Sequence, residues 1–241
     1  MLETTLQPGV DTGTARLRRS GITSTGPDAL PDLLLIERAR AGDERAIEAL
    51  IRRYSGRLFR VAVSVLLEHE RAEAAVVDAF LAAFGDLNRY EPTGKFAAWL
   101  TRLAFAQARA LRGGTRVLHA EAAPSESAAQ ALSAGVDEVH QRRALEQAIG
   151  SLPEVFRTVY VLRMIEGISG IETAASLGLH ETTVRTRLFR AHRRLPADMP
   201  QRLRALPSLL ELSPQGAERV VSRALPQLRH GSMATISAPP P

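Results

Sequence analysis

The sequence of 241 residues contains no cysteine, few aromatic residues and no long uninterrupted apolar run. Without cysteine, the chain can form no disulfide and offers no thiolate to a metal ion or to a covalent reaction. Aromatic residues make up only 5% of the sequence, so we do not expect nucleic-acid binding that relies on stacking bases on many aromatic rings. The N-terminal segment lacks the apolar core of a secretory signal, and no stretch is long enough to span a membrane. We therefore expect a cytoplasmic protein without membrane contacts.

The sequence also lacks the residue patterns of common catalytic sites. Gly94 and Lys95 match the end of a phosphate-binding loop, but Arg89 stands where that loop requires glycine. No serine or aspartate has a base at a suggestive spacing. We predict that the protein is not an enzyme and holds neither a metal ion nor a cofactor. Its histidines are scattered and form no HExxH zinc signature; they are His69, His119, His140, His180, His192 and His230.

Positive charge and three consecutive helical patterns are what the sequence does contain. A formal net charge of +5 and an isoelectric point near 10.5 favour a polyanionic partner. The first pattern is expected to begin with Ser151 as N-cap and Pro153 in the first turn, and to end at Gly167. Its apolar face repeats at helical spacing and consists of Val155, Val159 and Leu162.

The second and third patterns are separated by a single glycine. Ser169 and Glu172 have the spacing of a capping box, in which each side chain satisfies one free backbone N–H group. Ala174 and Leu177 supply the buried side of this short second helix, and Gly178 makes the tight turn after it. The third helix is predicted over residues 181–195, where an apolar stripe is formed by Val184, Leu188, Ala191 and Leu195.

The other face of the third helix carries arginines without a compensating acid after Glu181. A helix of this size fits the major groove of DNA, and arginine forks suit phosphate oxygens and the edge of guanine. We predict that Arg185, Thr186, Phe189 and Arg190 reach base edges and thymine methyls, whereas Arg187, Arg193 and Arg194 mostly contact phosphates. The full predicted DNA-binding set comprises Thr182, Thr183, Arg185, Thr186, Arg187, Phe189, Arg190, Arg193 and Arg194.

A plain three-helix bundle with a solvated basic face is the alternative interpretation. We favour a helix-turn-helix because the capping box, the turn glycine and the arginine-rich helix occur in the order that this motif requires. His180 departs from a good motif, since histidine caps a helix less well than serine does.

The segment before this motif has the pattern of a helical bundle, so the predicted fold class is all-α with two small domains. Residues 32–112 contain four amphipathic stretches, and Asp43 is expected to cap the second of them. Trp99 shares a stripe with Phe96 and Leu103, which favours a core position over an exposed role in melting DNA strands.

Tails and a linker surround the two predicted domains. Residues 1–31 and 231–241 are predicted to be disordered, and residues 113–136 form a flexible linker to the helix-turn-helix domain at 137–196. Residues 197–230 form a C-terminal extension with one amphipathic helix. We favour a satellite helix packed on its own domain; the alternative is a helix that covers a binding face and holds the two domains together until a partner displaces it.

Residues 152–163 and 166–195 together resemble the promoter-binding C-terminal domain of extracytoplasmic-function (ECF) sigma factors of bacterial RNA polymerase. The layout of ERARAGD at residues 37–43, the run 72–84 and FAAWLTRLAFAQA at 96–108 resembles the N-terminal domain of the same family. The resemblance implies a sigma factor that binds core RNA polymerase and recognises double-stranded promoter DNA. It also implies an anti-sigma factor as a further partner.

The family resemblance also implies a polymerase-binding surface on the third helix of the N-terminal domain. The residues it assigns there are Glu73, Val77, Asp78 and Phe80. This chain departs from the family pattern at Ala74 and Val77, where Asp and Gln are usual, and at residues 104–106, where ARN is usual. Two alternatives therefore stay open: a DNA-binding regulator that has lost polymerase binding, and an interaction module that binds anti-sigma factors without DNA.

Overall fold

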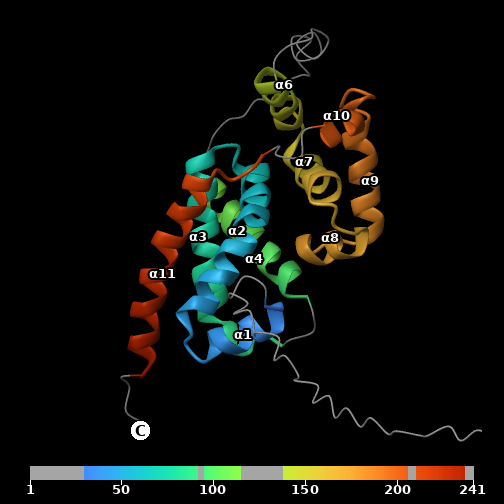
Figure 1. Cartoon of the computed structure of the whole chain (residues 1–241). Coiled ribbons are helices and arrows are strands. Elements are labelled where there is room, and N and C mark those ends of the chain that lie inside the picture. The colour runs from blue at the N-terminus through green and yellow to red at the C-terminus, as the bar shows by residue number, and fades with distance from the viewer. Residues whose placement is uncertain (1–29, 92–94, 115–137, 206–209, 237–241) are drawn as a thin grey trace, which may run out of the picture.

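The computed structural model describes residues 30–91, 95–114, 138–205 and 210–236, and every regular element in these ranges is helical. The predicted all-α class is confirmed. Figure 1 shows an N-terminal bundle of α1 to α4, a C-terminal group of α6 to α10 beside it, and α11 along the other side of the bundle. The predicted linker lies almost entirely outside the described residues.

The N-terminal domain is built around α2, the longest of its helices. Asp43 caps α2 as predicted, because its carboxylate accepts from the backbone N–H groups of Arg45 and Ala46 at 3.0 and 3.4 Å. The last helix extends slightly beyond the predicted start of the linker. The elements are α1 (Asp32–Arg40), α2 (Glu44–Leu66), α3 (His69–Gly85), η2 (Leu87–Arg89) and α4 (Phe96–Gly114).

The core of this domain follows the predicted helical stripes. Leu50, Leu58, Phe80 and Leu100 are completely buried between α2, α3 and α4. Trp99 differs from its predicted core position, because it is only half-buried and stacks on Tyr90 with ring centroids 4.9 Å apart. The stacked rings of Trp99 and Tyr90 therefore lie at the margin of the bundle and cover one edge of its core.

The C-terminal domain begins with α6 and places three short helical segments before the predicted DNA-reading helix. Ser151 is not the N-cap of α7: its hydroxyl donates to the carbonyl of Ala148 at 2.7 Å, and Pro153 takes the capping position. Val155 is 44% exposed, so it does not join the apolar face with Val159. The elements are α6 (Glu138–Gly150), α7 (Glu154–Tyr160), η3 (Val161–Ile165), α8 (Gly170–Leu177), α9 (Glu181–His192) and α10 (Met199–Ala205).

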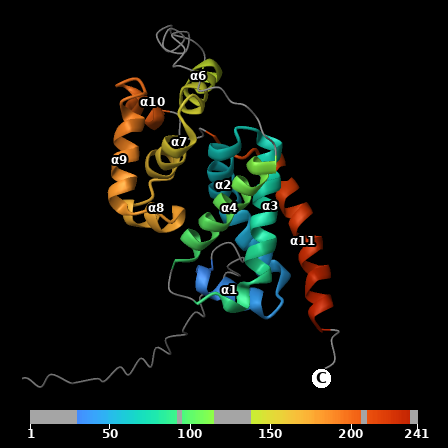
Figure 2. The ribbon, with the colours of Figure 1, turned by 180° about the vertical axis from the view of Figure 1, so that it is seen from behind.

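The two domains are in direct contact. The views in Figures 1 and 2 place α7 and α8 against the bundle, where α7 packs on α2 and α8 packs on α4. A small apolar cluster joins them: Val61 of α2 contacts Leu162 and Ile168, with Phe105 of α4 and Leu177 of α8 at its edge. The structure is therefore a closed arrangement of the predicted domains.

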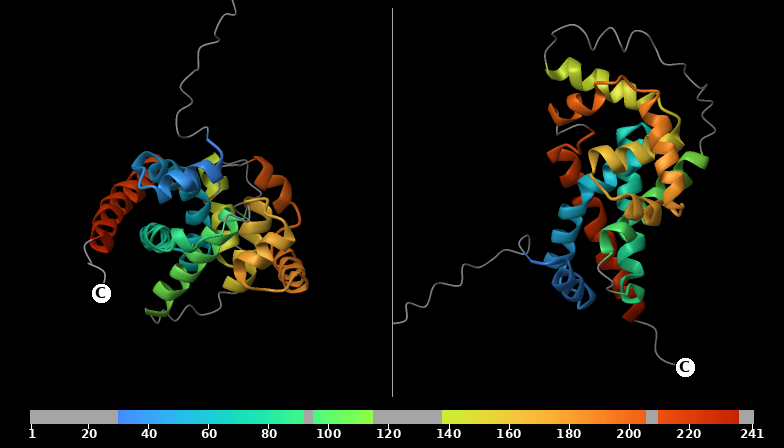
Figure 3. Two further views of the ribbon diagram at one scale, coloured as in Figure 1. Left: turned by 90° about the horizontal axis from the view of Figure 1, so that it is seen from below. Right: turned by 90° about the vertical axis from the view of Figure 1, so that its right-hand side faces the viewer.

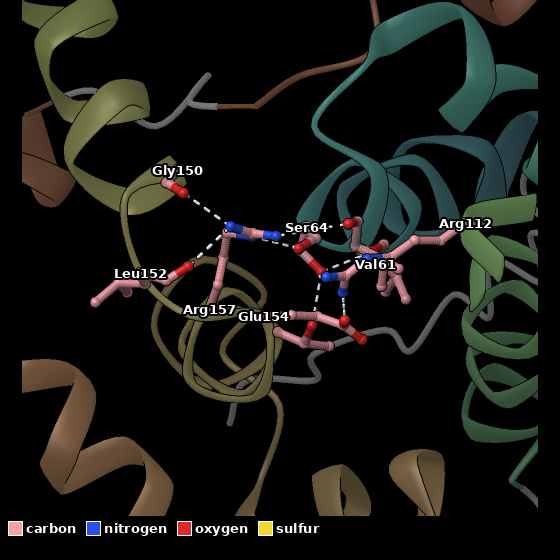
Figure 4. A network of polar contacts seen from close by, with 9 residues as sticks. Val61, Ser64, Arg112, Gly150, Leu152, Glu154 and Arg157 are labelled. Carbon is pink, nitrogen blue, oxygen red and sulfur yellow. Dashed lines mark hydrogen bonds and ion pairs between the residues drawn. The ribbon is translucent and has the colours of Figure 1, made fainter. Parts of the chain in front are cut away.

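Polar groups near Arg157 complete this contact (Figure 4). The guanidinium of Arg157 donates to the carbonyls of Gly150 and Leu152, each at 2.8 Å, and to that of Ser64 in α2. Burial, together with the nearby positive charge of Arg112, lowers the pKa of Arg157 to about 10, so the group is still charged at neutral pH. Arg112 in turn forms an ion pair with Glu154.

The amphipathic helix of the C-terminal extension does not pack on its own domain, so the favoured satellite-helix prediction is wrong. Helix α11 (Pro214–Ile236) crosses to the N-terminal domain and packs on α3 and α2. The left view of Figure 3 shows it on the side of the bundle opposite α9. The helix also continues past residue 230, where a disordered tail was expected to begin. The N-terminal bundle is thus held between the C-terminal domain on one side and α11 on the other.

Candidate nucleic-acid interface

Two short-range signals fix the turn between α8 and α9. Ser169 accepts from the N–H of Glu172 at 3.2 Å, and the Glu172 carboxylate accepts from the N–H of Ser169 at 3.3 Å, which is the predicted capping box. Gly178 ends α8 with φ at +64°, a backbone conformation that glycine adopts without steric cost. Both predicted features are confirmed, and together they set the direction in which α9 leaves α8.

The apolar side of α9 anchors it to its two neighbours. Val184 is 2% exposed and packs with Val159 of α7 and Ala174 of α8. Ala191 is completely buried, although α9 ends at His192 instead of running to Leu195. The helix begins at His180 without a side-chain cap, as the weak capping residue suggested. Because one stripe is fixed in the core, the opposite stripe must face away from the domain.

The outward side of α9 carries the predicted DNA-binding residues. Thr183 and Arg187 are half-buried at the edge of the helix, and the remainder are exposed. Phe189 is 61% exposed, which is unusual for a large apolar side chain on a folded domain. The exposed residues are Thr182, Arg185, Thr186, Phe189, Arg190, Arg193 and Arg194.

Most of the arginines on this side keep their charge available. Arg185 is the exception, since it lies 3.7 Å from Glu181 in an exposed i,i+4 pair of small energetic value. Arg190 makes no ion pair with any residue that the structure describes. The guanidinium of Arg193 lies 6.0 Å from the ring centre of Phe189, and that of Arg194 lies 4.9 Å from Phe156. These ring contacts orient the two guanidinium groups without neutralising them.

Sequence reasoning missed a shallow groove between α9 and the start of α7. Its volume is about 380 Å³, and Val155 and Phe156 form one wall opposite Thr182 and Thr186 of α9. The hydroxyl of the exposed residue Thr186 donates to the carbonyl of Thr182 at 2.9 Å, so its oxygen can still accept a hydrogen bond. The exposure of Val155, which was expected in the core, therefore has a reason: this residue lines the groove.

Comparison with known proteins identifies the two domains separately. The family model described as Sigma-70 region 2 matches residues 50–116, and the one described as Sigma-70, region 4 matches residues 142–195. The chain belongs to the sigma-70 family. The region 4 match contains the capping box, the turn and all of α9, and the region 2 match contains most of α2 together with α3 and α4.

Similar proteins place the chain among the ECF sigma factors. It is 30% identical to the RNA polymerase sigma-H factor of Pseudomonas aeruginosa over 175 residues, which is 66% of this chain and 89% of that protein. It is also 30% identical to the ECF RNA polymerase sigma-E factor of Escherichia coli over 176 residues, 68% of this chain and 92% of that one. CnrH, solved in complex with the cytosolic domain of CnrY, has a TM-score of 0.51 and 29% identity, and covers 72% of this chain and 97% of CnrH.

The residues predicted to bind polymerase lie on α3 of region 2, but most of them are covered. Glu73 and Val77 are each 5% exposed, and Phe80 is completely buried in the core. Phe80 therefore cannot contact a partner directly in this arrangement, because it packs inside the bundle. Asp78 is half-buried, and this burial raises the pKa of its carboxyl. The assignment of these residues to polymerase binding stays a prediction.

The described parts of the sigma factor contain neither a metal-binding cluster nor a membrane-spanning helix. No group of three or more histidine or acidic side chains there is placed to hold a metal ion. In the same ranges, each helix is too short or too polar to cross a membrane.

Proposed function

We propose that this ECF sigma factor binds core RNA polymerase and directs it to promoters, with α9 reading the upstream promoter element. The observation that carries the proposal is the arrangement of α9. Val184 and Ala191 fix one stripe in the core, so Arg190 and its neighbours are presented outward at the spacing of a major-groove reader. The region 2 and region 4 matches in one chain supply the two halves that initiation requires.

The division of labour within α9 follows from the chemistry of its side chains. Arginine can donate two parallel hydrogen bonds to the O6 and N7 atoms of guanine, and exposed methyl groups of threonine and the Phe189 ring suit the thymine methyl. Arginines at the C-terminal end of the helix lie where the duplex backbone passes, so they bind phosphate and supply salt-dependent affinity. The proposed role needs no catalytic chemistry in this chain, and it places the protein in the cytoplasm with the polymerase.

In vitro transcription with purified core polymerase tests this proposal directly. We expect the sigma factor to make core polymerase start at discrete sites on fragments of its own genome. The double variant Arg185→Ala with Arg190→Ala should abolish these starts while leaving binding to core polymerase intact. Failure of the unaltered protein to bind core polymerase at any concentration tested would overturn the proposal.

A DNA-binding regulator without polymerase contact is the second candidate function. The substitutions at Ala74 and Val77 and the burial of Glu73 favour it, because they remove polar groups from the surface of region 2. A pull-down with core polymerase, combined with a footprint on genomic fragments, separates the two: a footprint without a pull-down supports the regulator.

An anti-sigma factor is also part of the proposal. CnrH was solved with a second protein on it, the cytosolic domain of CnrY. We infer that this chain accepts a protein partner of the same kind. If the helical domains bind such a partner and no footprint is found, the interaction-module alternative is the correct one.

A further inference from the structure

Helix α11 seats an apolar stripe on the surface formed by α3 and α2. Val220 and Ala224 are completely buried there, and Val221 is 5% exposed. Figures 1 and 2 show this helix on the side of the bundle away from α7, α8 and α9. The contact therefore plays no part in presenting α9 to DNA, and it buries a face of region 2 that is separate from the contact between the domains.

The centre of this contact is a bidentate ion pair between Arg219 and Glu73. The Nε and Nη2 atoms of Arg219 donate to the two carboxylate oxygens of Glu73 at 2.8 and 2.5 Å. The Glu73 side chain is 7% exposed, whereas that of Arg219 is 49% exposed. A parallel pair of this kind is directional as well as strong, so it fixes where α11 sits along α3. Glu73 is also one of the residues that the family resemblance assigns to polymerase.

Gly216 allows the first turn of α11 to approach α3 closely. A Cβ atom at this position would lie 2.9 Å from a carboxylate oxygen of Glu73 and 2.6 Å from the side chain of Leu212, which are both shorter than normal contacts. Ser213 caps the same turn, because its hydroxyl accepts from the N–H of Gly216 at 3.0 Å. The lack of a side chain at Gly216 is therefore matched to the position of Glu73.

Half-buried apolar side chains (Ala217, Leu225 and Leu228) and exposed ion pairs form the margin of the contact. Arg52 of α2 lies 3.0 Å from Glu218, and Arg229 lies 2.5 Å from Glu44. Exposed pairs of this kind contribute little and are screened by salt. Pro226 lies inside α11, where proline removes a backbone hydrogen bond from the helix. A short apolar stripe and one buried ion pair therefore hold the helix in place, and the exposed pairs at its margin add little.

We propose that α11 is a built-in cover over α3, which occupies the face that region 2 uses for core polymerase and must leave before the complex forms. This inference rests on the proposed function. The apparent affinity for polymerase is then the intrinsic affinity reduced by the fraction of molecules in which α3 is uncovered.

Variants that release α11 from its own side form the first test. Gly216→Leu forces the side-chain ends of Glu73 and Leu212 to shift, and Arg219→Glu sets two acids against each other. Both leave α3 unchanged. Arg223→Glu is the matched control, because Arg223 is exposed on the same helix and makes no ion pair with any described residue. Hydrogen exchange of the amides in α11 reports its release.

We expect the two releasing variants to bind core polymerase about ten-fold more tightly or better, and the control to bind like the unaltered protein. If α11 exchanges freely and the affinity does not change, the cover proposal is overturned and the sigma function stands. If neither the variants nor the unaltered protein binds polymerase, the proposed function itself has failed.

A cross-linked variant gives the opposite test, and the absence of cysteine makes it specific. Arg52→Cys and Glu218→Cys, joined by a short bismaleimide, tie α11 to α2 without changing α3. The cross-linked protein should bind core polymerase at least about ten-fold more weakly than the same double variant without cross-linker. Equal binding of the two forms would overturn the proposal, whatever the releasing variants show.

Discussion

Arg157 of region 4 donates a hydrogen bond to the main-chain carbonyl of Ser64, in the last turn of α2 in region 2. The last carbonyls of a helix have no partner within it, and a positive charge at this end is favourable. Arg157 also reaches the carbonyl of Val65 at 3.5 Å. One domain therefore caps a helix of the other, so the order of region 2 at this end depends on its contact with region 4.

Replacing Arg157 with methionine should destabilise the protein by about 2 to 4 kcal/mol, because several buried carbonyls lose their donor while the volume is kept. Urea unfolding followed by circular dichroism measures this change. Arg143→Met is the control: Arg143 is exposed on α6, and its loss should change the free energy of unfolding by less than about 0.5 kcal/mol. Equal effects of the two substitutions would show that Arg157 does not cap α2.

Glu166 provides a second link between the domains. Its side chain is 6% exposed and lies between Arg57, at 3.2 Å, and Arg60 of α2. Glu166→Gln leaves two guanidinium groups without their acid, which should cost the closed arrangement about 1 to 3 kcal/mol, since both arginines keep some contact with solvent. Small-angle scattering should show a larger radius of gyration for this variant. The control Glu37→Gln, at an exposed site on α1, should leave the radius unchanged.

Signals that act within a few residues of the chain were sufficient to predict much of the fold. The Asp43 cap, the Ser169 and Glu172 capping box and the Gly178 turn each depend on neighbours at fixed spacing. Helical periodicity placed Val184 in the core for the same reason. The position of α9 and the direction of its outer face could therefore be predicted from sequence.

Contacts between distant segments could not be predicted in this way. Arg219 and Glu73 are 146 positions apart, and nothing in the periodicity of α11 says which helix it will meet. The prediction that Ser151 is the N-cap of α7 failed for a different reason. Ser151 and Pro153 are both helix-start signals, and the serine hydroxyl donates to the carbonyl of Ala148 instead of capping α7. The packing of the two domains likewise depends on complementary surfaces rather than on local pattern.

Asp78 predicts a pH-dependent stability. Burial raises the pKa of its carboxyl, and the carboxylate has no ion pair with any described residue. A raised pKa in the folded state means that protonation stabilises the fold at low pH, and that this contribution is lost as the pH rises through the folded pKa. Asp78→Asn should therefore raise the melting temperature at pH 7. The free energy of unfolding should increase by less than about 1 kcal/mol, because the group is partly exposed.

The gain should shrink as the pH falls and vanish below the ordinary value of 3.8, where both forms are neutral. Thermal unfolding of the unaltered protein and of Asp78→Asn between neutral and acidic pH measures the difference in stability between them. The other titrating groups are the same in both proteins, so their contributions cancel in this difference. A lower melting temperature for Asp78→Asn at pH 7 would mean that the carboxylate has a stabilising partner.

Two arginines on α9 separate base reading from phosphate binding. Arg190 lies on the outward face of the helix, whereas Arg193 follows its last turn and lies over Phe189. Arg190→Ala should weaken binding to the upstream element by about 1 to 3 kcal/mol and relax its sequence preference. Arg193→Ala should weaken binding to all duplexes alike and reduce the slope of log affinity against log salt by about one.

Titrations of both variants on a start-site duplex and on a scrambled duplex, at several salt concentrations, measure these effects. The comparison is informative because both substitutions remove the same charge, so a purely electrostatic surface predicts the same loss for each on each duplex. Only contacts with base edges make the loss at Arg190 depend on sequence. If Arg190→Ala lowers the affinity equally for the start-site duplex and the scrambled duplex, α9 attracts DNA without reading its sequence.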